Sequence, residues 1–180
     1  MKNLIILIGF ITGLTLYGQD LQTETRAIEK AHETVSVAKK NFKKALGEAI
    51  KKKGPAGALG ECKIMAPTLG LKNEQIELGR TSHKLRNQAN KPREWVQPLL
   101  EEYKKSSVTD HAKNKLINFG PNHYGYVEPI YIEAVCLNCH GSDLKPEVRK
   151  ELSELYPSDQ ATGFKLGDFR GLIWLESKAQ

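Results

Sequence analysis

The residues best suited to chemistry are two cysteines and a histidine in the last third of the chain. Cys136 and Cys139 are three positions apart and His140 follows directly, in the pattern C-x-x-C-H. This spacing is typical of the attachment site of a c-type haem, because two thiols can add across the two vinyl groups of the porphyrin. The next side chain then falls under the iron, for which imidazole is a strong axial ligand. The pattern predicts one covalently bound haem c, with His140 as a metal ligand.

Other uses of a C-x-x-C pair explain the sequence less well. A structural zinc site needs a second cysteine or histidine pair at short spacing, and the sequence contains none. A disulfide or a redox-active dithiol leaves His140 without a role. The third cysteine, Cys62, has no obvious partner, and an odd cysteine in an exported protein requires an explanation.

The second axial position of the iron has several candidate ligands in the sequence. They are Cys62, Met65, His32, His83, His111 and His123. A thiolate from Cys62 would lower the reduction potential of the iron, whereas the thioether of Met65 would raise it. The histidines are more typical of polar surface positions, and the residues alone leave the choice open.

A long amphipathic helix is expected over residues 19–53. Leu21, Ile28, Val35 and Phe42 recur every seven residues, and small alanines follow three positions after the last three of them. This narrow apolar stripe is suited to partial packing on the same domain, and a homodimer seam between two such helices is the alternative. Gly54-Pro55 is expected to end the helix and begin another.

Shorter elements are expected along the rest of the chain. Composition and turn signals predict helices at 56–65, 93–105 and 145–156, a strand at 76–81, one or two strands at 123–132 broken at Pro129, and two strands of a hairpin at 164–175 that meet at Gly167-Asp168. These elements must bring the haem pattern together with whatever supplies the second ligand.

The composition and the N-terminal residues limit the classes of protein to which this chain can belong. Residues 1–18 combine an early lysine with a short apolar run, which predicts a signal peptide and a periplasmic location; an uncleaved N-terminal anchor is the alternative. The predicted organisation is then a signal peptide at 1–18, the long helix at 19–53 and a haem-binding domain at 54–180. The formal charge of +6 comes largely from lysines on the long helix. We interpret them as a solvated face, and export argues against a nucleic-acid partner.

Five groups of residues, in order, carry a resemblance to a known family. They are Gly54-Pro55 through Cys62 with Ala66-Pro67, Arg80-Thr81-Ser82 with Arg86-Asn87 and Asn90, Pro129-Ile130 before the C-x-x-C-H pattern, Tyr156-Pro157 with Asp159, and Gly167-Asp168 with Arg170-Gly171. On these residues the chain resembles the exported haem c-binding family with a PAS-like fold, long filed as a domain of unknown function.

The resemblance implies a fold and a set of ligands. The fold would be α+β, a PAS-like antiparallel sheet flanked by helices, with a long N-terminal helix. The haem would be bound at Cys136 and Cys139, with His140 as one axial ligand and Cys62 as the other.

Three arginines are further candidates for haem binding. They are Arg80, Arg86 and Arg170, whose guanidinium groups could pair with haem propionates, because a guanidinium fork fits a carboxylate. Ordinary structural or surface arginines are the alternative.

These features predict a sensor rather than an enzyme. With two protein ligands the iron has no open position, so we expect a periplasmic sensor of redox state or of a diatomic gas, with Cys62 as the ligand that is lost. A small electron-transfer cytochrome with a redox partner protein is the alternative. A peroxidase-like enzyme is a third reading, for which no spacing of His83 or His123 with an arginine gives support.

Overall fold

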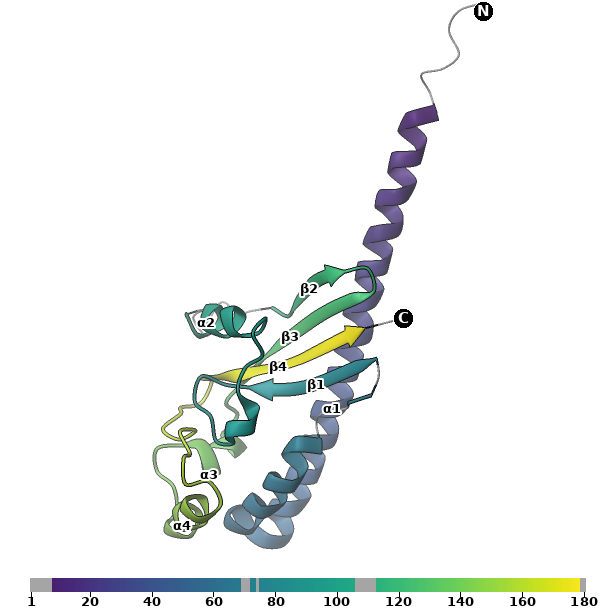
Figure 1. The fold of residues 1–180 in the computed structure, drawn as a ribbon. Coiled ribbons are helices and arrows are strands. Elements are labelled where there is room, and N and C mark those ends of the chain that lie inside the picture. The colour runs from purple at the N-terminus through teal and green to yellow at the C-terminus, as the bar shows by residue number, and fades with distance from the viewer. Residues whose placement is uncertain (1–7, 69–71, 74, 106–112, 179–180) are drawn as a thin grey trace, which may run out of the picture.

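The computed structural model describes residues 8–68, 72–73, 75–105 and 113–178, and for 8–21, 23 and 61–68 within them only the backbone. A four-stranded antiparallel sheet has the long helix α1 (Ile8–Thr68) on one face and the short helix α2 (Gln97–Lys105) on the other. Two further short helices, α3 (Leu137–His140) and α4 (Pro146–Leu155), lie together beyond one end of the sheet (Figure 1). The prediction of an α+β, PAS-like antiparallel sheet flanked by helices is confirmed.

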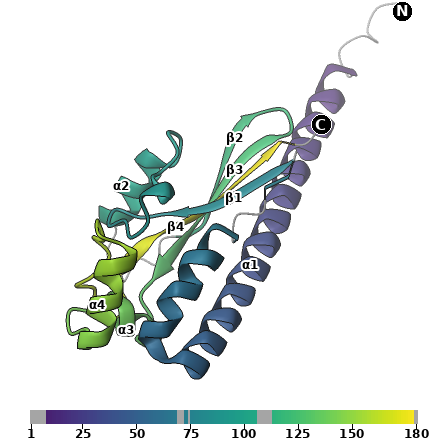
Figure 2. The same ribbon diagram turned by 60° about the horizontal axis from the view of Figure 1, so that its bottom comes forward.

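Helix α1 consists of two arms joined at a kink. Gly54 has φ 69° and ψ 174°, a backbone conformation that is strained for residues other than glycine. Pro55 follows, and its fixed φ suits the first turn of the second arm. The predicted break at Gly54-Pro55 is therefore present, and the second arm turns back beside the first (Figure 2). Among the described residues, no helix combines the length and apolar character needed to cross a membrane.

The apolar stripe of α1 packs on the sheet of its own domain. Ala31, Val35 and Ala38 are buried in one cluster with sheet residues that include Tyr126 and Ile173. Small alanines allow the helix backbone to approach the sheet closely. Ile28 lies further toward the N-terminus and is 36% exposed. Nearer its N-terminus α1 extends past the sheet (Figure 1). The packing expected on the domain is present from Ala31 onward.

The sheet has the order β1-β4-β3-β2. Its strands are β1 (Ile76–Thr81), β2 (Lys115–Gly120), β3 (His123–Tyr131) and β4 (Phe169–Lys178). β4 is central and is covered on both faces. Ile173 and Leu175 pack toward α1, while Leu172 and Trp174 pack toward α2, as the two-residue period of a strand requires. The predicted strand at 76–81 is confirmed.

Two strand predictions need correction. β3 is one strand through Pro129, which pairs with Leu172, so the predicted break is absent. Pairing of β3 with β2 ends at Val127, so the proline lies where one side of the strand is open, and its missing N–H costs no ladder bond there. Residues 164–168 form turns rather than a strand, because their backbone groups bond to the haem-pattern segment and to Ile132 instead.

The helix predictions are largely confirmed. α4 occupies Pro146–Leu155 within the predicted 145–156, with Val148 and Leu152 buried. α2 begins at Gln97 rather than at residue 93. The residues before it form a turn in which Val96 N–H donates to the Arg93 carbonyl, and Pro98 then falls in the first helical turn, where no N–H is needed.

Candidate haem site

The C-x-x-C-H pattern folds into one short helical segment. A 3-10 turn, η3 (Ala134–Cys136), leads directly into α3, so both thiols and the imidazole come from two consecutive turns. Cys136 and Cys139 are partly buried and form no disulfide. The Cys139 Sγ lies 4.0 Å from the carbonyl oxygen of Pro55, at the start of the second arm of α1. The structure thus places Cys139 against that arm, whereas Cys136 packs against the cluster of Ile132, Ala161 and Phe164.

The imidazole of His140 is held in one tautomer. Its Nδ1–H donates to the carbonyl oxygen of Ala161 over 2.7 Å, because a carbonyl can only accept. The other ring nitrogen, Nε2, then carries the lone pair that binds a metal. Burial, followed by the charges of Arg86 and Arg170, holds the pKa of His140 well below its usual range. The ring is therefore neutral at physiological pH, as an axial ligand must be.

The loop after α4 fixes the haem-pattern segment through its backbone. The N–H of Phe164 donates to the His140 carbonyl over 2.9 Å, and the N–H of Gly163 donates to the Gly141 carbonyl over 3.0 Å. Gly163 has φ 76°, so it allows the loop to turn where other residues would be strained. Phe164 is buried against Ala161 and Ile132. This loop therefore sets the position of the histidine in the fold.

An ion pair between Arg86 and Asp159 joins the segments around His140. The Arg86 Nη2 is 3.1 Å from Asp159 Oδ2, with side chains only 11% and 9% exposed. The same Nη2 donates to the Cys139 carbonyl over 2.5 Å and to the Ala161 carbonyl over 3.1 Å. Asp159 Oδ1 accepts from the N–H of Ala161 over 2.8 Å. Arg86 and Asp159 thus hold the backbone of Ala161, whose carbonyl accepts the hydrogen bond from His140.

Arg170 is fixed beside this pair at the start of β4. Its Nη1 donates to Ser82 Oγ over 2.5 Å and to the Lys84 carbonyl over 3.1 Å. Burial, then the neighbouring charges of Arg80 and Arg86, lowers the pKa of Arg170 to about 10, with Asp159 acting in the opposite direction. Arg170 remains a cation at physiological pH.

The charges and polar atoms of the site fit a haem. Among the described side chains, the charges of Arg80, Arg86 and Asp159 all act on Arg170. Guanidinium groups at such a site suit the two propionates of a haem. Among the described side chains, the buried His83 Nδ1 and Thr81 Oγ1 have no hydrogen-bond partner. Unsatisfied buried polar atoms are rare in native proteins. These two lie on the segment that contains Arg80, whereas Trp174 Nε1, which also has no hydrogen-bond partner among the described side chains, lies on β4.

The second arm of α1 brings the Cys62 backbone close to the same site. Leu59 is buried with Val148 and Leu152 of α4, and Cys139 packs against this cluster. Cys62 is one helical turn beyond Leu59. Its side chain lies outside the described residues, as do those of Met65 and His111, so these ligand predictions stay predictions.

The remaining histidines have different surroundings. His32 hydrogen-bonds Tyr126 on the face of the sheet covered by α1, and His123 hydrogen-bonds Glu176. His83 stacks on Phe169 with ring centroids 5.8 Å apart and contacts Phe164, which also contacts His140. Among the described alternatives to Cys62, His83 is the one that shares an aromatic neighbour with His140.

Sequence reasoning did not assign a role to two residues that hold His140. Asp159 was part of the family resemblance, but its contacts with Arg86 and Ala161 could not be inferred from spacing. Ala161 acts through its backbone carbonyl, for which no side-chain signal exists. The charges of Arg80, Arg86 and Arg170 all act on His140, and the Arg80 guanidinium lies 5.5 Å from the ring centroid of Phe42. Their pairing with propionates stays a prediction.

Comparisons with known proteins agree with the family resemblance. A family model described as Tll0287-like matches residues 18–176. Among solved structures, the cyanobacterial heme-protein Tll0287 is similar, at 24% sequence identity and a TM-score of 0.48 over 69% of this chain and 72% of that chain. The search of curated proteins gave no match.

Proposed function

Because this chain belongs to the Tll0287-like family, we propose that it is a haem c protein. The observation that carries the proposal is the imidazole of His140, anchored through Nδ1 in the same short segment as two thiols that form no disulfide. Cys136 and Cys139 would hold the haem covalently, and His140 would bind the iron through Nε2. The guanidinium groups of Arg80 and Arg170 would bind the propionates.

Cys62 is the proposed second axial ligand. It is the remaining cysteine of the chain, and its backbone lies on the arm of α1 that contacts Cys139 and α4. Thiolate is a strong ligand for ferric iron and a weaker one once the sulfur is protonated or the iron is reduced. When bound, the haem would supply an iron centre whose oxidation state or gas ligand controls that bond.

The shape of α1 supports the proposal of a sensing role. The helix carries the Cys62 arm beyond Gly54 and extends at its other end past the sheet (Figure 1). A change at Cys62 would act on the arm and reach the long first arm through the kink. We propose a sensor of redox state or of a diatomic gas that signals to a partner protein or within a homodimer, without catalysing a reaction. Export to the periplasm would be directed by residues 1–18.

Spectra of the matured protein and of Cys62→Ala test the proposal. We expect a pyridine haemochrome typical of covalently bound haem in both proteins, and a ferric EPR signal of thiolate ligation only in the wild type. Met65→Leu is a matched control, because Met65 is the alternative sulfur ligand on the same arm, and it should leave the EPR signal unchanged. A colourless protein from a haem-maturing host contradicts the haem proposal, and an unaltered signal in Cys62→Ala contradicts the ligand assignment.

An electron-transfer cytochrome is the alternative function, and gas binding separates the two. A sensor that exchanges a ligand should bind carbon monoxide or nitric oxide once reduced, with a shift of the haem Soret band. A carrier that keeps both ligands should bind neither. Failure to bind either gas would therefore favour the carrier and contradict the gas-sensing form of the proposal.

A further inference from the structure

The ion pair of Arg86 and Asp159 acts on His140 through a shared carbonyl. The Ala161 oxygen accepts from His140 Nδ1 over 2.7 Å and from Arg86 Nη2 over 3.1 Å. A carbonyl that already binds a guanidinium group is a weaker acceptor for the imidazole. We propose that Arg86 and Asp159 are positioning residues that set the reduction potential of the haem iron through this carbonyl, an inference that rests on the proposed function.

The hydrogen bonds around Ala161 support a positioning role for Arg86 and Asp159. Asp159 holds the Ala161 N–H through Oδ1 and Arg86 through Oδ2, while Arg86 holds the Ala161 and Cys139 carbonyls. Both charged side chains are about nine-tenths buried. Arg86 therefore uses Nε and Nη2 to bind protein groups around the ligand, which is the arrangement of a positioning residue.

The sign of the effect follows for each partner. A strong acceptor at Nδ1 makes an imidazole more electron-rich, which stabilises ferric iron and lowers the potential. Arg86 weakens that acceptor and adds positive charge, and both effects raise the potential. Asp159 adds negative charge close to the same group, which lowers the potential.

Substitutions of the two residues should therefore move the potential in opposite directions. We expect Arg86→Gln to lower the midpoint potential and Asp159→Asn to raise it, with the amide of Asn still able to hold the Ala161 N–H. Arg86→Lys keeps the positive charge but loses the paired donors of the guanidinium group. It should therefore lower the midpoint potential by less than Arg86→Gln. Potentiometric titration of each matured protein measures these shifts.

A purely structural role for the pair predicts a different result. Loosening the site admits water, which stabilises ferric iron, so both Arg86→Gln and Asp159→Asn would then lower the potential. The exposed ion pair of Arg93 and Glu77 on β1 offers matched controls, since Arg93→Gln and Glu77→Gln should leave the potential unchanged. A fall in Asp159→Asn, or no shift in either variant, overturns the inference.

A haemochrome assay on every variant separates this inference from the proposed function. A wild type that carries no haem overturns both proposals. Covalent haem in all proteins with potentials that do not follow the expected signs overturns only the inference. If Arg86→Gln does not fold, Arg86→Lys and Asp159→Asn carry the test, because each keeps part of the buried network.

Discussion

Two polar networks of this molecule differ in the charged groups that they contain. The docking network joins α1 to β3 and comprises His32, Lys39, Asn114, Tyr126 and Glu128. There the buried Tyr126 hydroxyl bonds His32, Asn114 and Glu128 over 3.1, 2.7 and 3.3 Å, and Lys39 pairs with Glu128. One cation faces one carboxylate.

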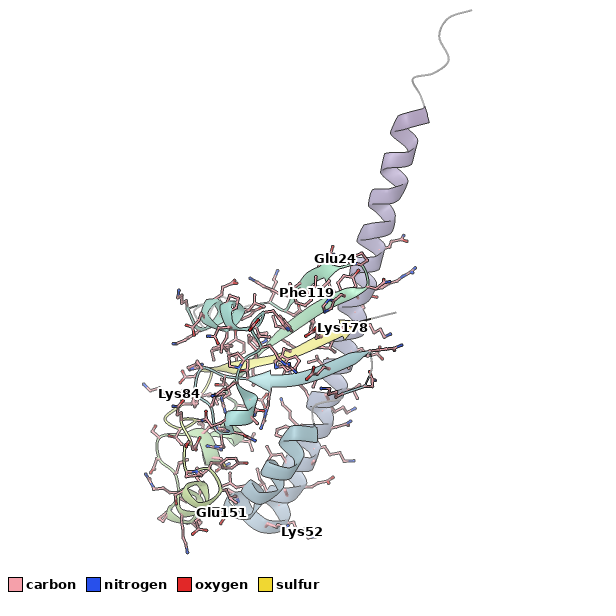
Figure 3. The ribbon with its side chains drawn as sticks, in the orientation of Figure 1. Glu24, Lys52, Lys84, Phe119, Glu151 and Lys178 are labelled. Carbon is pink, nitrogen blue, oxygen red and sulfur yellow. The ribbon has the colours of Figure 1, made fainter. Side chains whose placement is uncertain are left out.

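Among the described side chains, the haem-site network comprises Arg80, Arg86, Asp159, Arg170 and His140, whose charges act on one another. In Figure 3, Lys84 and Glu151 lie at this end of the molecule, and Phe119 and Lys178 lie at the opposite end of the sheet. The docking network joins two elements of the fold through groups that pair with one another, whereas the haem-site network gathers guanidinium groups near the predicted iron ligand His140. The first arrangement serves the fold, and the second supports the proposed cofactor.

Removing the single carboxylate of the haem-site network should give the largest loss of stability. Asp159→Ala leaves Arg86 buried beside two other cations, and breaking such a buried pair costs about 3–5 kcal/mol of unfolding free energy. Urea unfolding followed by circular dichroism measures the loss. Glu77→Ala, which breaks the exposed pair with Arg93, should cost about 1 kcal/mol or less. Equal losses of unfolding free energy in Asp159→Ala and Glu77→Ala would contradict the expected difference between the buried and the exposed ion pair.

A smaller loss is expected in the docking network. Tyr126→Phe removes a hydroxyl whose hydrogen-bond partners can bond to water instead. The substitution should lower the free energy of unfolding by about 1–2 kcal/mol and leave the haem spectrum unchanged. Burial raises the pKa of Tyr126 to about 12. The unfolded tyrosine ionises near pH 10 while the folded one does not, so stability should fall as pH rises from about 10 toward 12. The decline should be shallower in Tyr126→Phe, and an altered Soret band would argue against a purely structural network.

The weakest expected effect is an acid dependence at His83. Burial, then the charges of Lys104 and Arg170, lowers the pKa of His83 below 6.5, with Glu101 opposing. In the unfolded chain His83 becomes protonated below about pH 6.5, whereas in the folded protein it stays neutral to lower pH. The free energy of unfolding should therefore fall as pH drops through that value. Unfolding of His83→Gln between pH 7 and 5 should show a flatter profile. If the variant has the same pH dependence of stability as the wild type, His83 does not cause that dependence.

Much of the fold could be predicted because local patterns determine it. The glycine and proline at 54–55 mark the kink of α1, and the β-branched and apolar residues of 76–81 mark a strand, since both signals act within a few residues. The strand predicted within 164–168 was wrong because its apolar residues suit a strand locally, yet Phe164 packs on Ala161 and bonds the His140 carbonyl. Pro129 was misjudged for the same reason, since only the sheet order shows which strand edges are open.

The sequence by itself determined the chemistry: two thiols and an imidazole at a spacing that suits covalent attachment of a haem, because that spacing depends on a single short segment. It also placed this chain in its family. Only the tertiary structure decided the surroundings of His140, because the Ala161 carbonyl, Arg86 and Asp159 come from segments up to 75 residues apart. Contacts between such segments depend on how the sheet and helices pack, and no local pattern encodes which backbone carbonyl will meet a given ring nitrogen.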